Sequence, residues 1–145
     1  MRILAVDLGL ARTGIAVSDP GGMIAAPVGT IAERHMDVLL QKVAAAAAEQ
    51  KAEAIVVGHP RNMDGTRGES AQRAEAFAAA LGETTGLPVN LWDERLTTAS
   101  AIGYLNMTDT RGKKRKAVVD TVAATIILQD YLDSLRLRRE RETQA

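Results

Sequence analysis

The chain has 145 residues, which is the size of one ordinary domain and enough to bury a hydrophobic core. Its 18 basic and 18 acidic side chains cancel, which argues against a protein that coats nucleic acid through overall charge. The lack of cysteine excludes disulfides and thiolate metal sites. The first residues lack the apolar stretch of a signal peptide, and no apolar run reaches the roughly 20 residues that span a bilayer, so we expect a cytoplasmic protein.

Three short apolar segments open the chain, over residues 2–9, 13–19 and 23–31. Glycine and the sequence Asp-Pro-Gly-Gly separate them, and both are typical of tight turns, so we expect an antiparallel meander of three strands. A helix is expected over 36–50, because apolar side chains recur there at helical spacing and alanine, a strong helix former, is repeated.

Helices and strands alternate through the rest of the chain. The segment 52–60 is almost wholly apolar, which is typical of a strand covered on both faces. The other expected elements are a helix over 69–85 that Gly86 and Pro88 close, a strand over 87–95, a short helix over 97–107 and a longer helix over about 117–138.

This order of elements predicts an α/β fold. The predicted sheet is mixed and five-stranded, a three-strand antiparallel meander plus two parallel strands, with helices on both faces. We expect a single domain over residues 1–138 and a flexible C-terminal tail over 139–145.

Acidic side chains fall at the ends of two predicted strands and on the last helix. Asp7 ends the first strand, and the segment "DER" at 93–95 ends the fifth. Ligands of open α/β sheets bind at that edge. Asp120 lies on the stripe of the last helix that faces the sheet, where a carboxylate needs a cationic partner. Each acid alone also fits a structural role: a turn cap for Asp7, an ion pair with Arg95 for Glu94, and a helix N-terminal charge for Asp120.

Four motifs in this chain resemble those of one known family. They occur in the order and spacing of the YqgF family, also called RuvX, of RNase H-like nucleases, and they read "DLGLARTGIAVSD" at 7–19, "GHPRNMDGTRG" at 58–68, "DERLTT" at 93–98 and "KRKAVVDTVAATIILQDYL" at 114–132. The resemblance covers residue 1 to about 135. It implies an RNase H-like fold and a divalent-metal nuclease, described either as a pre-16S rRNA processing nuclease or as a Holliday junction resolvase.

The resemblance also implies the active-site acids, which on this pattern are Asp7, Glu94 and Asp120. The chain departs from the family pattern at His59, where an apolar residue is common, and the role of His59 stays open. Asp93 is the alternative to Glu94, because strand alternation puts only one of these two neighbours on a given face. The family pattern, and not periodicity, favours Glu94.

The chemistry of phosphodiester hydrolysis agrees with three clustered acids. Two cations roughly 3.5–4 Å apart can activate water and stabilise charge on the entering and leaving oxygens. Carboxylate oxygens suit Mg²⁺ or Mn²⁺, so Asp7 would bridge two metal ions while Glu94 and Asp120 each hold one. Gly58, at the end of the strand expected between Asp7 and Glu94, would leave room for a phosphate.

Basic and hydroxyl side chains near these acids are candidates for substrate binding. Arg12 and Arg95 could each hold a phosphate through two hydrogen bonds, and Thr97 or Thr98 could donate from a helix N-terminus, although ion pairs and helix caps also explain them. The basic run "RGKKRK" at 111–116 supplies the remaining candidates, or else a solvated loop; they are Lys113, Lys114, Arg115 and Lys116.

The favoured prediction is a metal-dependent endonuclease, a hydrolase acting on ester bonds, that processes the 5′ end of pre-16S rRNA; resolution of Holliday junctions is the alternative. Scarce aromatics favour structured RNA or branched DNA held by its backbone, with no membrane partner. Monomer and homodimer stay open. An ATP-handling enzyme is more remote, because its two-domain cleft needs a longer chain. A catalytically silent nucleic-acid-binding module is also more remote, because clustered acids repel a polyanion unless cations intervene.

Overall fold

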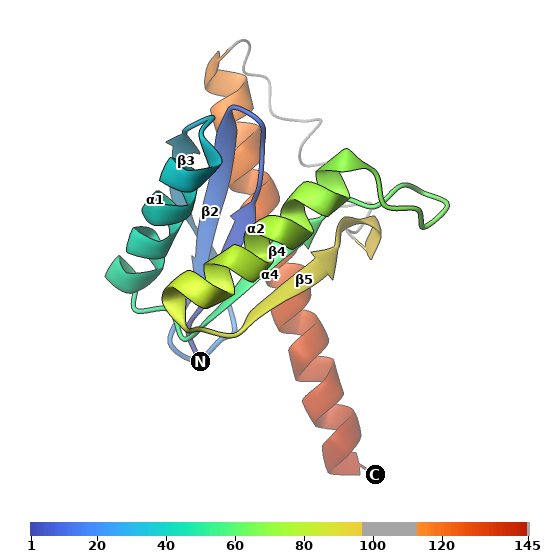
Figure 1. Ribbon diagram of the computed structural model, residues 1–145. Coiled ribbons are helices and arrows are strands. Elements are labelled where there is room, and N and C mark those ends of the chain that lie inside the picture. The colour runs from blue at the N-terminus through green and yellow to red at the C-terminus, as the bar shows by residue number, and fades with distance from the viewer. Residues whose placement is uncertain (97–112, 145) are drawn as a thin grey trace.

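The structure is a computed structural model that describes residues 1–96 and 113–144, with side chains for residues 1–96 and 121–143. Five strands form one sheet in the order β3-β2-β1-β4-β5 (Figure 1). The short helix expected over 97–107 lies outside the described residues.

The sheet is mixed, as the sequence predicts. β1 (Ile3–Asp7), β2 (Arg12–Ser18) and β3 (Ala25–Ala32) form the antiparallel meander. β4 (Ala54–His59) pairs parallel with β1, and β5 (Val89–Asp93) pairs parallel with β4. The predicted α/β class and the predicted sheet are therefore confirmed.

Helices cover both faces of the sheet (Figure 1). α1 (Met36–Glu49) and α2 (Glu69–Thr85) pack on one face, and α4 (Lys113–Gln144) crosses the other. Gly86 ends α2 in the left-handed conformation with a φ of 72°, which agrees with the predicted end of this helix. A single 3₁₀ turn, η1 (Glu94–Leu96), follows β5 directly.

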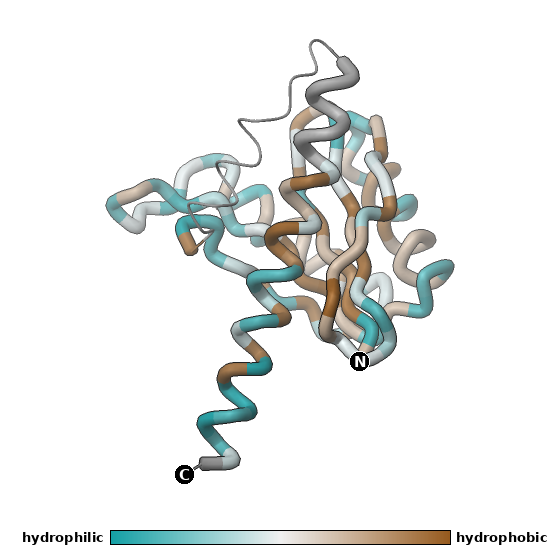
Figure 2. Tube along the Cα trace, turned by 180° about the vertical axis from the view of Figure 1, so that it is seen from behind, coloured by the Kyte–Doolittle hydropathy of each residue, from teal (hydrophilic) through white to brown (hydrophobic). Residues whose placement is uncertain are grey.

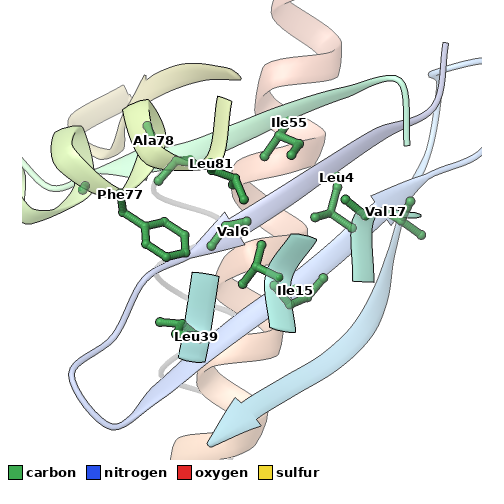
Figure 3. Close-up of a cluster of buried hydrophobic side chains, with 13 residues drawn as sticks. Leu4, Val6, Ile15, Val17, Leu39, Ile55, Phe77, Ala78 and Leu81 are labelled. Atoms are coloured by element: carbon green, nitrogen blue, oxygen red, sulfur yellow. The ribbon is translucent and has the colours of Figure 1, made fainter. Parts of the chain in front are cut away.

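Two hydrophobic layers hold the helices to the sheet, because successive side chains of a strand point to opposite faces. Leu4 and Val6 of β1 pack with Leu39 of α1 and Phe77 of α2 (Figure 3). Ala5, between them, packs on the opposite face in the cluster formed with Ala124 and Leu128 of α4. All six residues of β4 are buried, as expected for a strand covered on both faces.

Helix α4 is longer at both ends than the sequence predicts. It begins at Lys113, so the expectation that 113–116 form a loop before a helix starting near 117 is wrong. It continues to Gln144, and beyond the sheet its residues are mostly hydrophilic (Figure 2). The flexibility of residues 139–145 stays a prediction. Within the described ranges, no helix is both long and apolar enough to cross a membrane.

Polar contacts tie α4 to the edge strand β3. The hydroxyl oxygens of Thr30 and Thr121 share a hydrogen bond of 2.7 Å. Further along the helix, the backbone N–H of Ala25 donates to Oε1 of Gln129 over 2.9 Å. These two contacts fix the position of α4 along β3.

Candidate active site

The three parallel strands end at one edge of the sheet, and each ends with a titratable side chain. β1 ends at Asp7, β4 at His59 and β5 at Asp93, and His59 lies opposite Asp93 in the strand register. This is the edge at which open α/β sheets bind ligands. The fold therefore brings Asp7 and Asp93 to the same edge of the sheet, where the sequence predicts the site.

Glu94 turns back from η1 toward β4 and β1. Its side chain hydrogen-bonds with that of Asp7, so the two predicted acids meet although 87 positions separate them in the chain. A Cβ placed on Gly58 would lie 2.5 Å from Oε1 of Glu94 and 3.0 Å from Cδ1 of Ile127. The space that we assigned to a phosphate beside Gly58 is therefore filled by the Glu94 carboxylate.

The surroundings of Glu94 disfavour its charged form. Burial raises the pKa of the Glu94 carboxyl, and the neighbouring charge of Asp93 raises it further, whereas the hydrogen bond with Asp7 and the nearby His59 act in the opposite direction. Two carboxyl groups in contact can share a proton, and a cation can take the place of that proton. The Asp7–Glu94 pair therefore fits a divalent metal ion, which prefers oxygen ligands.

The structure does not describe the side chain of the third predicted acid, Asp120. Its backbone lies on α4, and two residues of the stripe that it was predicted to share, Ala124 and Ile127, are buried against the sheet. Among the described side chains, no three metal-ligating groups come together. The assignment of Asp120 as a metal ligand stays a prediction.

Asp93 and Glu94 have different partners. Oδ2 of Asp93 accepts hydrogen bonds from Nη2 of Arg95 over 2.6 Å and from its Nε over 3.0 Å, and Oδ1 accepts from the Arg95 backbone N–H over 3.0 Å. The hydrogen bonds from Arg95 hold the pKa of Asp93 below its usual value. Asp93 is thus engaged with Arg95 while Glu94 meets Asp7, which supports Glu94 as the metal-ligand candidate.

The predicted substrate-binding residues lie in different places. Arg95 directs Nε and Nη2 at Asp93, so the two-point grip expected for phosphate is already occupied. Arg12 begins β2 and lines a surface pocket of about 500 Å³ with Glu33, Arg34 and His35. The remaining candidates lie outside the described side chains; they are Thr97, Thr98, Lys113, Lys114, Arg115 and Lys116.

His59 belongs to a chain of polar contacts that the sequence did not reveal. Its Nε2 lies 2.7 Å from Oε2 of Glu75 on α2, and Arg67 binds the same carboxylate through Nε at 2.8 Å and Nη2 at 2.7 Å. His59 is only 9% exposed. The strand end beside the two carboxylates is therefore fixed to α2. Arg67 lies in the motif at 58–68, but neither the motif nor the spacing indicates its contact with Glu75, because that contact depends on how α2 packs against β4.

Comparisons with known proteins show the family of this chain. A family model described as "RuvX: Holliday junction resolvase" matches residues 1–134. A protein of Geobacillus kaustophilus named "Putative pre-16S rRNA nuclease" is 47% identical over 138 residues, covering 94% of this chain and 100% of its own length. A protein of the same name from Lachnospira eligens is 44% identical over 137 residues, covering 92% of this chain and 98% of its own.

Solved structures with low sequence identity support the fold. The RuvC of T. thermophilus in complex with a Holliday junction superposes with a TM-score of 0.54 at 13% identity, over 88% of this chain and 91% of that one. The fowlpox virus Holliday junction resolvase superposes with a TM-score of 0.53 at 13% identity, over 92% of this chain and 99% of that one. The predicted RNase H-like architecture and the predicted nuclease family are both confirmed. The chain belongs to the RuvX family.

Proposed function

We propose that this chain is a metal-dependent endonuclease that hydrolyses phosphodiester bonds in structured nucleic acid. The observation that carries the proposal is the contact between Asp7 and Glu94 at the edge where the parallel strands end. Gly58 lies next to Glu94 and leaves room for its carboxylate. A half-buried pair of acids in contact is costly without a cation, and burial raises the pKa of the Glu94 carboxyl accordingly. A site for binding a polyanion gains nothing from such a pair unless cations bind there too.

Asp7, Glu94 and Asp120 would hold the metal ions, Mg²⁺ or Mn²⁺. When bound, these ions supply an activated water and offset the negative charge that develops on the entering and leaving oxygens of the phosphodiester. The carboxyl groups of Asp7 and Glu94 stay in contact, because β1 and η1 fix the two backbones and Gly58 leaves the space that the Glu94 side chain occupies. His59, held by Glu75, restrains the strand end next to them.

For the natural substrate, the first choice is the 5′ end of pre-16S rRNA, because the curated relatives carry that name over almost their full length. Resolution of Holliday junctions is the second candidate, and the description of the matching family model favours it. Arg12, Thr97, Thr98 and the basic residues at 113–116 would contact the backbone of either substrate. The proposed site of action is the cytoplasm, and the proposed domain covers residues 1–138.

A cleavage assay tests this proposal. The purified chain is incubated with a 5′-labelled precursor RNA that contains the 16S 5′ end, and separately with a labelled four-way DNA junction, each with Mn²⁺ and with EDTA. We expect metal-dependent cleavage that Asp7→Asn abolishes while circular dichroism of the variant stays that of a folded protein. Metal-independent cleavage, or equal cleavage by Asp7→Asn, would overturn the proposal. Preference for one of the two probes decides between the two candidate substrates.

A further inference from the structure

The loop over residues 60–68 extends from the end of β4 directly beside the carboxylate pair. The loop begins at residue 60, directly after His59, and Gly58, which lies beside Glu94, is two positions before it. A Cβ placed on Gly65, within this loop, would lie 3.4 Å from Nη1 of Arg95, so the loop also borders the turn that carries Glu94. The loop therefore forms one wall of the candidate active site.

Hydrogen bonds within the loop give it a defined shape. The N–H of Asn62 donates to the carbonyl of Thr66 over 3.0 Å, and the N–H of Gly65 donates to the carbonyl of Asn62 over 2.8 Å. The carboxylate of Asp64 accepts from the N–H of Thr66 over 2.9 Å. At the far end of the loop, Arg67 is held by Glu75, which also binds His59. Both ends of the loop are thus anchored to the same carboxylate.

Three arginines line this wall, and acidic side chains neutralise two of them. Arg67 pairs with Glu75 at 2.7 Å, and Arg95 pairs with Asp93 at 2.6 Å. Arg61 forms no ion pair within the described part of the chain.

The head of Arg61 is nevertheless held in place. Its Nη2 donates to the carbonyl of Gly65 over 2.6 Å, and its Nε is buried without an acceptor among the described residues. The positive charge of Arg61 helps to lower the pKa of the Asp93 carboxyl. Arg61 is therefore a pre-positioned cation beside the candidate site, with no carboxylate of the described residues within ion-pair distance.

We propose that Arg61 binds a backbone phosphate of the nucleic acid, on the β5 side of the Asp7–Glu94 pair, so that the loop over 60–68 is a phosphate subsite. This inference rests on the proposed function. A guanidinium suits the role because it presents several donors in one plane to phosphate oxygens. The subsite differs from the basic run at 113–116, which lies on α4, and from Arg95, whose Nε and Nη2 are taken by Asp93.

The test measures binding without cleavage. In an Asp7→Asn background with Mg²⁺, fluorescence anisotropy gives the Kd for a labelled RNA hairpin and for a labelled four-way DNA junction at several salt concentrations. Arg61→Gln should weaken binding by roughly threefold to tenfold and reduce the slope of log K against log salt by about 0.9 on duplex arms. The matched control is Arg138→Gln, because Arg138 is an exposed arginine on the C-terminal part of α4. It should leave the slope unchanged.

A second variant separates charge from loop shape. Arg61→Lys keeps the positive charge and should retain the salt slope while losing part of the affinity, because an ammonium lacks the planar donor set. An unchanged slope in Arg61→Gln, an equal loss in Arg138→Gln, or loss of the slope in Arg61→Lys would each overturn the phosphate subsite. Absence of cleavage by the parent chain would instead count against the proposed nuclease function, and the binding comparison would stand on its own.

Discussion

Thr30 and Thr121 join the edge of the sheet to the helix that carries Asp120, through hydroxyl oxygens 2.7 Å apart. Thr30 lies in β3, and Thr121 directly follows Asp120. The contact fixes the backbone of α4 next to the third predicted acid. It therefore links the stability of the helix to the geometry proposed for the metal site.

Replacing Thr30 by Val should lower the free energy of unfolding by about 0.5–1.5 kcal/mol, because the Thr121 hydroxyl loses a hydrogen-bond partner. Urea denaturation followed by circular dichroism measures this change. Thr30→Ser keeps the hydroxyl and is the control. Equal stabilities for the Val and Ser variants would show that the hydrogen bond contributes nothing measurable.

Gly58→Ala should strongly reduce cleavage, because the added Cβ would come within 2.5 Å of Oε1 of Glu94 and displace its carboxylate. Overpacking of this kind also costs about 1–3 kcal/mol of stability. Initial rates and urea midpoints give both quantities. Gly82→Ala is the matched control, because its Cβ would meet nothing closer than 3.7 Å and alanine favours a helix by about 0.5–1 kcal/mol. Full activity in Gly58→Ala would contradict the placement of Glu94.

The two acids of "DER" should respond differently to neutralisation. Glu94→Gln removes a proposed metal ligand and should lower the cleavage rate by more than about 100-fold, whereas Asp93→Asn loosens Arg95 and should cost about tenfold or less. Single-turnover rates at saturating Mn²⁺ give the comparison. The reverse order of effects would make Asp93 the ligand and Glu94 the structural residue.

Adding metal should raise the thermal stability of the chain. At Mn²⁺ concentrations 100 times its Kd, binding to the folded state alone contributes about 2.7 kcal/mol, so the melting temperature should rise with Mn²⁺ and fall back with EDTA. Asp7→Asn should remove most of this shift. An equal Mn²⁺ shift in that variant would place the metal elsewhere. Differential scanning fluorimetry detects the shift without any substrate.

Glu75 makes stability depend on pH in the acidic range. Its hydrogen bonds from Arg67 and His59 hold the pKa of the folded protein's Glu75 below the usual value of 4.5. A lowered folded-state pKa means that the stabilisation is present above the unfolded-state pKa and is lost as the pH falls through the folded-state pKa. Urea midpoints should therefore fall less steeply below about pH 4.5 in Glu75→Gln than in the parent chain. If the urea midpoints of Glu75→Gln and of the parent chain fell in parallel with pH, Glu75 would not contribute to the pH dependence of stability.

The sequence predicts the sheet well because its signals are local. Apolar runs with turn residues between them locate β1 to β5, and Gly86 locates the end of α2. Alternation of side chains cannot decide between Asp93 and Glu94, because η1 breaks the strand geometry between these two neighbours.

Contacts between elements distant in the chain are the part that sequence patterns miss. The link from His59 through Glu75 to Arg67 depends on the position of α2 over the end of β4, and no spacing in the chain encodes that position. The start of α4 at Lys113 differs from the predicted start near 117 for another reason. A dense run of basic charge is typical of a solvated loop, yet lysine and arginine are also good helix formers, and here they begin the helix.

The end of α4 lies far from the carboxylates along the sheet. A groove at the opposite edge brings Leu135 and Arg139 together with Ile3 and Ala54, which are the first residues of β1 and β4. The amino group of Met1 at this edge donates to the carbonyl of Pro20 over 2.8 Å. A fluorophore or surface tether attached to this end of α4 would therefore leave the edge with the Asp7–Glu94 pair open to a large nucleic-acid substrate.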